Sequence, residues 1–140
     1  MRDFHNNLLV KRAISSTRVT DNTAQVSQII DRQGFESVEF VVNIGTLADA
    51  DATVAFLLEE GDNSALSDAA TVSATDTLGT QAAAGFQFDS DNQVRKIGYL
   101  GIKRYLRVTL TPANNTGNLD VGVLALLYKG DGLPITQPTS

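Results

Sequence analysis

The chain has 140 residues, with no cysteine and no tryptophan, one histidine and one methionine. Without cysteine it has no disulfide bonds, no thiolate metal sites and no cysteine nucleophile, so its stability must come from packing or assembly. The single histidine, His5, lies near the N-terminus and has no second histidine with which to bind a metal. We therefore predict neither a histidine-based metal site nor a catalytic histidine.

Long apolar runs are missing as well. The longest, Val121 to Tyr128, is shorter than the roughly 18 residues that a membrane-spanning segment needs, so we expect no membrane partner. The first residues include Arg2 and Asp3 in place of a long apolar segment with a cleavage site. This start predicts no secretion signal and a chain that stays in the compartment where it is made.

Motifs that carry enzyme chemistry are absent. The sequence has no GxSxG, no HExxH, no phosphate-binding loop and no GxGxxG. Asp49, Asp51 and Glu60 have the spacing of the first, third and twelfth positions of an EF-hand, but Val54 stands where that loop requires glycine. We therefore predict no enzyme activity, no cofactor and no metal site, with a shared carboxylate site for a cation as the weaker alternative.

Charge is present in moderate amount and is unevenly distributed. Hydrophobic residues make up 42% of the chain and charged residues 19%, a composition typical of a globular domain. The net charge of −5 divides into +2 for residues 1–30, −11 for residues 31–91 and +4 for residues 92–140. Complementary regions of this kind can face each other within one subunit or between copies. Solvated charge of both signs is an equally good explanation.

Alternation of apolar and polar residues dominates from residue 24 onward. In residues 37–44, SVEFVVNI, an apolar side chain occupies every second position, as in a strand with one buried face. About eight such short strands, separated by turn residues, predict an all-β antiparallel β-sandwich or jelly roll, with a closed barrel as the alternative. The expected organisation is an extended N-terminal arm (1–23), a β-sandwich domain (24–128) and an extended C-terminal tail (129–140).

A basic segment stands out in this acidic chain. Residues 93–111 are expected to form a hairpin joined around Gly101, and Pro112 is expected to end its second strand because proline cannot donate to a β-ladder. The hairpin carries five of the eleven positive charges: Arg95, Lys96, Lys103, Arg104 and Arg107. A net charge of −5 repels a polyanion, so we expect no nucleic-acid partner. Ion pairs with the acidic middle, within or between subunits, are the favoured explanation.

Two apolar groups are candidates for protein contacts. Leu8, Leu9 and Val10 interrupt the polar N-terminal region, either as an arm that adds a strand to a neighbouring sheet or as an edge strand of the same domain. In the last predicted strand, Leu124 and Leu126 make the second face apolar too. That face is either covered by the chain itself or used as an interaction surface.

Two stretches of the sequence carry a resemblance to known proteins. The run DNTAQVSQIIDRQGFESVEFVVNIGTLADADATVAFLLEEGDNSALSDA and the later run KIGYLGIKRYLRVTLTPANNTG resemble a family of small proteins encoded in the structural gene clusters of tailed phages and prophages. The resemblance extends over residues 8–128. The family has no catalytic motif, so no site residues are carried over from it.

The resemblance implies a virion structural protein, and a capsid decoration or cement protein is the favoured role. The expected partners are the major capsid protein or other virion proteins, together with further copies of the chain in a homo-oligomer, a trimer being favoured. The expected location is the capsid surface, after synthesis in the cytoplasm of the bacterial host. A tail or head-to-tail connector component and a virion carbohydrate-binding module are the alternatives.

Three groups of residues are predicted to form the protein interface. Leu8, Leu9 and Val10 would be the docking arm, and Leu124 and Leu126 an oligomer face. The polar contacts that set the register would come from Lys103, Arg104 and Arg107.

Overall fold

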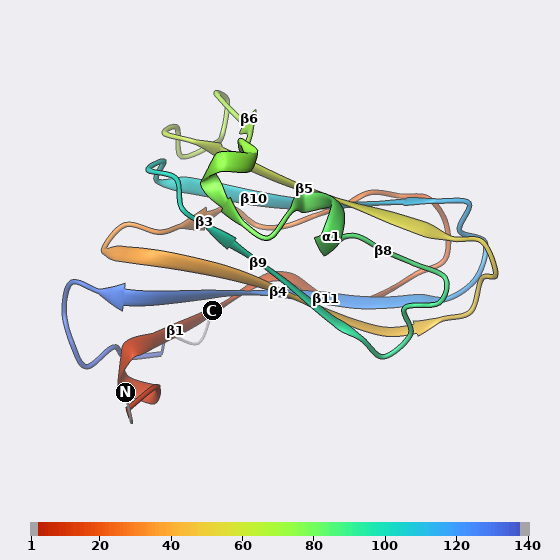
Figure 1. Cartoon of the computed structure of the whole chain (residues 1–140), viewed down its shortest axis with the longest axis horizontal. Coiled ribbons are helices and arrows are strands. Elements are labelled where there is room, and N and C mark those ends of the chain that lie inside the picture. Colours follow the sequence, from red (N-terminus) through yellow and green to blue (C-terminus); the bar gives the residue numbers. More distant parts are fainter. Residues whose placement is uncertain (1–2, 138–140) are drawn as a thin grey trace.

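The computed structural model describes residues 3–137 and consists of two antiparallel β-sheets packed against each other (Figure 1). The five-stranded sheet contains, in spatial order, β1 (Leu8–Val19), β11 (Leu119–Gly130), β4 (Phe35–Leu47), β9 (Val94–Tyr99) and β7 (Thr77–Leu78). The second sheet contains β2 (Gln25–Val26), β10 (Tyr105–Ala113), β5 (Thr53–Gly61) and β6 (Ala70–Thr71), with β3 (Ile30–Asp31) beside β10 and β8 (Phe86–Gln87) beside β5. The antiparallel sandwich predicted from strand alternation is confirmed.

The helical segments are short. They are η1 (His5–Asn7), η2 (Ala74–Asp76) and α1 (Gln81–Ala84), where the Thr80 side chain caps α1 by accepting a hydrogen bond from the Ala83 N–H. Figure 1 shows α1 and the segment before it on the side of β5 and β9. No helix within residues 3–137 has the length and apolarity required to cross a membrane.

The core lies between the inner faces of the two sheets. On β4, alternate residues are buried, and Phe40 and Val42 are 0% exposed. On β10, Leu106 and Val108 are also fully buried, as the alternation predicts. Each fully buried side chain of this size contributes roughly 1.5–3 kcal/mol of transfer free energy, so the alternating residues account for the stability of a chain without disulfides.

The predicted hairpin of residues 93–111 is wrong. β9 pairs with β4 and β7 in one sheet, whereas β10 pairs with β5, β2 and β3 in the other. The connection of residues 100–104 therefore crosses from one sheet to the other. Pro112 also lies inside β10, opposite Val54 of β5. The ladder tolerates it there because β2 pairs with β10 only at Thr109 and Leu110, which leaves one edge of β10 open at Pro112.

The N-terminal segment forms a strand of the domain itself. β1 pairs with β11 in a register that places Leu8 opposite Tyr128 and Val10 opposite Leu126. Of the two alternatives for this segment, the structure shows the edge strand and not the extended arm. Residues 1 and 2, which belong to the predicted arm, lie outside the described residues.

The segment after β11 folds back onto β1 where the sequence predicts an extended tail. The Ile135 N–H donates to the Asn6 carbonyl over 2.9 Å, and the Ile135 side chain packs against the core. The Gln137 side chain accepts from the Val10 N–H over 3.0 Å and donates to the Val10 carbonyl over 2.7 Å. An amide side chain thus pairs with the edge of β1 as a neighbouring strand would. The last part of the predicted tail, 138–140, lies outside the described residues.

Candidate functional site

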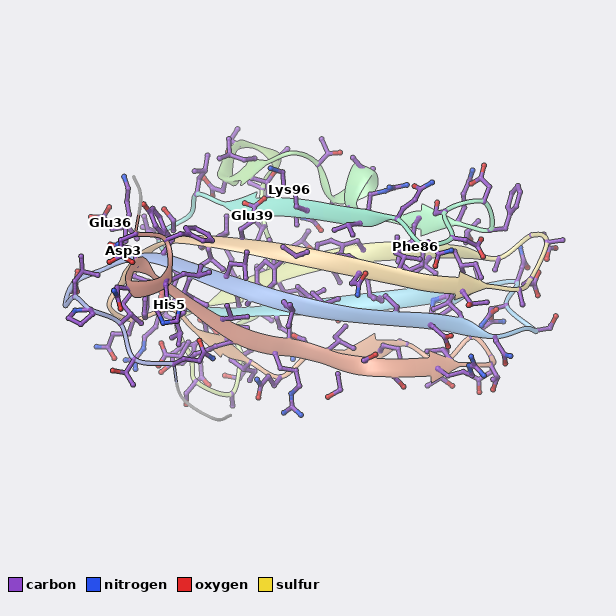
Figure 2. The ribbon with its side chains drawn as sticks, turned by 90° about the horizontal axis from the view of Figure 1, so that it is seen from below. Asp3, His5, Glu36, Glu39, Phe86 and Lys96 are labelled. Carbon is purple, nitrogen blue, oxygen red and sulfur yellow. The ribbon has the colours of Figure 1, made fainter. Side chains whose placement is uncertain are left out.

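The outward-facing side chains of β1, β11, β4 and β9 form one continuous surface, which we call the outer face. Figure 2 looks onto this sheet, with Glu39 and Lys96 labelled on neighbouring strands. The antiparallel registers arrange the outer face in rows across the strands. One row contains Val10, Leu126, Glu39 and Gly98, and the next contains Arg12, Leu124, Val41 and Lys96.

The centre of the outer face is apolar. The Leu124 side chain is 43% exposed, and Leu126, Val41, Val10 and Leu8 are half-buried. Residues 3–137 therefore leave this second apolar face accessible and do not cover it. A contiguous apolar patch on an otherwise polar surface is typical of a protein-binding site.

A groove of about 360 Å³ lies at one end of the outer face. Its floor is formed by β9 and β4 at Gly98 and Glu39, and its apolar walls are Phe4, Leu8, Leu78, Leu100, Leu126 and Tyr128. The rings of Phe4 and Tyr128 pack with centroids 6.2 Å apart and planes tilted by 38°. This volume lies at the lower end of the roughly 300–1,000 Å³ typical of ligand pockets, and it suits a single side chain or a small molecule.

Glu39 is the only acidic or basic side chain that lines this groove within the described residues. It lies opposite Gly98, and a Cβ atom at Gly98 would be 2.6 Å from Glu39 Oε2 and 3.2 Å from Leu78 Cβ. Glycine at position 98 thus makes room for the carboxylate over β9. Burial raises the pKa of Glu39, and the attraction of Lys96 offsets this only in part.

The predicted basic contacts lie on the other sheet and in the loop that leads to it. Lys103 Nζ is 2.7 Å from Asp62, Arg104 is 2.8 Å from Asp31, and Arg107 is 3.0 Å from Glu59. The basic segment thus makes its ion pairs with the acidic middle of the same subunit. The role of these three cations as contacts to a partner protein remains a prediction.

The predicted apolar contacts converge in part. Leu8 and Val10 come to lie beside Leu126 and Leu124 on the outer face, because β1 is the neighbour of β11. Leu9 points the other way and is buried at 7% exposure, opposite Leu127. The structure therefore unites two residues of the predicted arm with the predicted oligomer face and places Leu9 in the core.

A second, more polar cleft of about 640 Å³ lies where α1 and β8 meet β5 and β9. Gln81 and Arg95 are engaged here, since Gln81 bonds to Leu58 N–H and Val72 carbonyl, and Arg95 donates to Ser90 Oγ over 3.4 Å. Gln87, Asp89 and Gln93 also line the cleft and are exposed. No aromatic ring lies open along the cleft among the described residues, because Phe56 and Phe86 are both buried.

Asp49, the first residue of the acidic loop that was considered as a cation site, holds the loop together by hydrogen bonds. Asp49 accepts hydrogen bonds from the Asp51 N–H and from both the N–H and the hydroxyl of Thr116, which hold the pKa of Asp49 well below its usual range. Glu60 lies elsewhere and accepts from the Tyr99 hydroxyl. Within residues 3–137, no group of three or more histidine or acidic side chains is placed to hold a metal ion.

The sequence does not predict the groove with Glu39 and Gly98. A glutamate at an outward position of a strand is usually solvated charge, and a glycine in a strand usually weakens it. Their significance depends on the register between β4 and β9, which brings them opposite each other. The only local signal is Gly98 within an otherwise well-formed strand sequence, since such a glycine often marks close approach of another group.

Comparison with known proteins gives information on the fold. No protein-family model and no curated protein matches the sequence. The PBSX exported protein XepA has a similar structure, with a TM-score of 0.56 and 13% identity over 94% of this chain and 40% of that chain. An isomalto-dextranase from Arthrobacter globiformis T6, solved with panose, gives a TM-score of 0.50 and 9% identity over 86% of this chain and 23% of that chain.

A family 22 carbohydrate-binding module of Clostridium thermocellum Xyn10B gives a TM-score of 0.46 and 13% identity over 94% of this chain and 92% of that module. The chain spans less than half the length of XepA, and identities this low describe the fold alone. The comparison with XepA therefore shows a shared fold and nothing further.

Proposed function

We propose that this chain is a non-enzymatic structural protein of a phage particle that docks through its outer face onto the major capsid protein or another virion protein. The role that fits best is that of a capsid decoration or cement protein. The observation that carries the proposal is the apolar centre of the outer face around Leu124 and Leu126, which the described chain leaves uncovered. The fold shared with XepA supports an origin in a phage.

The mechanism of such a protein is mass action. A protein that binds the assembled lattice and not the separated subunits stabilises the lattice by RT ln(1 + L/Kd), where L is the free concentration of that protein. No catalytic group is required. A preformed, rigid sheet surface suits this task because little conformational entropy is lost when it docks.

The test uses purified phage particles from the strain that encodes the chain. Quantitative mass spectrometry should find the chain in hundreds of copies per particle, whereas a tail or connector component, with the closed ring symmetry of such assemblies, would be present in about a dozen. Particles that lack the chain altogether would contradict the proposal.

A matched pair of variants assigns the docking to the outer face. Leu124→Glu places a charge at the centre of the outer face, and Val26→Glu places the same charge at an exposed apolar residue of the second sheet. We expect Leu124→Glu to abolish particle occupancy and Val26→Glu to preserve it. Equal occupancy for the two variants would rule out docking through the outer face.

The polar cleft favours one second candidate, a carbohydrate-binding module of the virion. Gln87, Asp89 and Gln93 offer exposed amide and carboxylate groups that can hydrogen-bond sugar hydroxyls. The cleft has no exposed ring among the described residues on which a sugar could stack, so this candidate ranks second. Saturable binding on a glycan array that is lost in Gln87→Ala would favour it, and an array without binding would exclude it.

A further inference from the structure

The groove over Gly98 contains a carboxylate without a hydrogen-bond donor. Among residues 3–137, no side chain or backbone group donates a hydrogen bond to Glu39, and no cation lies within ion-pair distance of it. Only Lys96, exposed on the adjacent strand, acts on it electrostatically. A half-buried carboxylate in this state has lost part of its hydration without gaining a partner, which is costly.

The surroundings of Glu39 specify what kind of group would compensate it. A cation can form charge-assisted hydrogen bonds with the carboxylate, which are about twice as strong as neutral ones. The walls of the groove, Leu78, Leu126 and Tyr128 among them, are apolar and suit the methylene stem of a lysine or arginine side chain. Charge and shape therefore point to the same ligand, a cationic head on an apolar stem.

Within residues 3–137, no cation is placed to form an ion pair with Glu39. Most lysines and arginines of the described residues are already engaged, as in the pairs Arg18–Asp120, Lys103–Asp62 and Arg104–Asp31. Only the side chains of Lys96 and Lys129 make no hydrogen bond or ion pair within residues 3–137. The net charge of −5 in addition favours approach of a basic partner surface.

We propose that the groove over Gly98 receives one lysine or arginine side chain of a different protein, with Glu39 as its counter-ion. This inference rests on the proposed function, because it specifies the chemistry of the partner that docks on the outer face. The apolar centre around Leu124 provides buried area, and Glu39 sets the register by accepting one cation at one place.

The direct test is a titration of the purified, ¹⁵N-labelled protein with n-butylguanidinium chloride, a mimic of the arginine side chain, followed by NMR. We expect saturable shifts of the Gly98 and Leu78 amides in the wild type. In Glu39→Gln the affinity should fall about tenfold or more, which corresponds to the ~1.4 kcal/mol or more of a charge-assisted hydrogen bond. The uncharged analogue n-butylurea should bind the wild type as weakly as the cation binds Glu39→Gln.

Glu36→Gln is the matched control. Glu36 lies on the same strand and is exposed, but Figure 2 shows it at the end of the sheet, away from Glu39. This variant removes the same charge without changing the groove, so its affinity should equal that of the wild type. The Gly98→Ala variant tests the position of the Glu39 carboxylate instead of its charge. The added Cβ would displace the carboxylate, so the variant should bind n-butylguanidinium more weakly while its fold remains intact.

Three results would overturn the proposal. One is the absence of saturable shifts in the wild type, and another is equal affinity in Glu39→Gln and the wild type. The third is a homo-oligomer that sedimentation detects in the wild type and that both Glu39→Gln and Lys129→Gln dissociate, since the cation would then come from a second copy. A failure of the proposed function would look different. In that case the Leu124→Glu variant would still occupy the particle, and the wild type would still bind n-butylguanidinium.

Discussion

The hydroxyl of Tyr99 donates a hydrogen bond to the carboxylate of Glu60, and this contact joins the two sheets, since Tyr99 belongs to β9 and Glu60 to β5. The same oxygen accepts a hydrogen bond of 3.0 Å from the Lys103 N–H. Burial and the hydrogen bond to Glu60 raise the pKa of Tyr99, so it stays a donor throughout the physiological range. One phenol thus holds the connection between β9 and β10 in place.

Replacing Tyr99 by phenylalanine should destabilise the domain by about 1–3 kcal/mol, because Glu60 and the Lys103 N–H would each lose a partner. Urea denaturation followed by circular dichroism measures the change. The control is Tyr105→Phe. The hydroxyl of Tyr105 makes no hydrogen bond among the described residues, and the ring that lies beneath Arg104 is kept in the variant. A Tyr99→Phe variant as stable as that control would show that the contact between the sheets contributes little.

An aspartate introduced on the outer face of β11 should affect stability much less than one introduced on its buried face. Leu124→Asp is expected to change the free energy of unfolding by no more than about 0.5 kcal/mol, because Leu124 is 43% exposed on the outer face. Leu127→Asp should prevent folding, because Leu127 is 0% exposed and an unpaired charge would be buried. Circular dichroism and thermal melts of the two purified variants provide the comparison, and similar losses in both would contradict the register of β11.

The pKa of Glu39 predicts a pH-dependent stability. Its folded-state pKa lies above the unfolded value of about 4.3, so the folded state binds more protons and loses stability as the pH rises through the window between the two values. Glu39→Gln removes this penalty. We therefore expect the Tm of Glu39→Gln to match that of the wild type near pH 4 and to exceed it near pH 7. A constant difference in Tm across this range would mean that burial does not perturb Glu39.

The Gln137 side chain should protect the edge of β1. In Gln137→Ala, the Val10 amide loses the acceptor that the glutamine provides over 3.0 Å, and its hydrogen exchange should accelerate. Amides of β4, in the interior of the sheet, should exchange at unchanged rates. Hydrogen exchange followed by NMR resolves the two classes, and an unchanged rate for Val10 would indicate that the edge is protected by other contacts.

The sequence predicts which residues of the long strands are buried, but not which strands are neighbours. Alternation in residues 37–44 correctly places Phe40 and Val42 in the core, because that strand has one consistently apolar face. The same rule holds for Leu106 and Val108 in residues 104–111. Alternation carries no information on pairing partners, so adjacency in sequence is the only guide, and it predicts a hairpin of β9 and β10. The crossing between the sheets at residues 100–104 breaks that adjacency.

The sequence also predicts some residues of the candidate site but not how the strands bring them together. Leu124 and Leu126 follow from the second apolar face of their strand, and the structure leaves both accessible. Glu39 and Gly98 are 59 positions apart in the chain and acquire a joint meaning only through the pairing of β4 with β9. No local pattern encodes a contact at such a distance.

The order of strands in the five-stranded sheet has a consequence for biosynthesis. β11 lies between β1 and β4, so β1 has no partner in the sheet until residues 119–130 have left the ribosome. β4 can pair with β9 first, but β1 and the other edge of β4 must wait until β11 is made, and β11 then lies between them. Non-local pairing of this kind slows folding and exposes strand edges meanwhile. The outer face, which spans β1, β11 and β4, is consequently complete only after the last strand of the chain has been made.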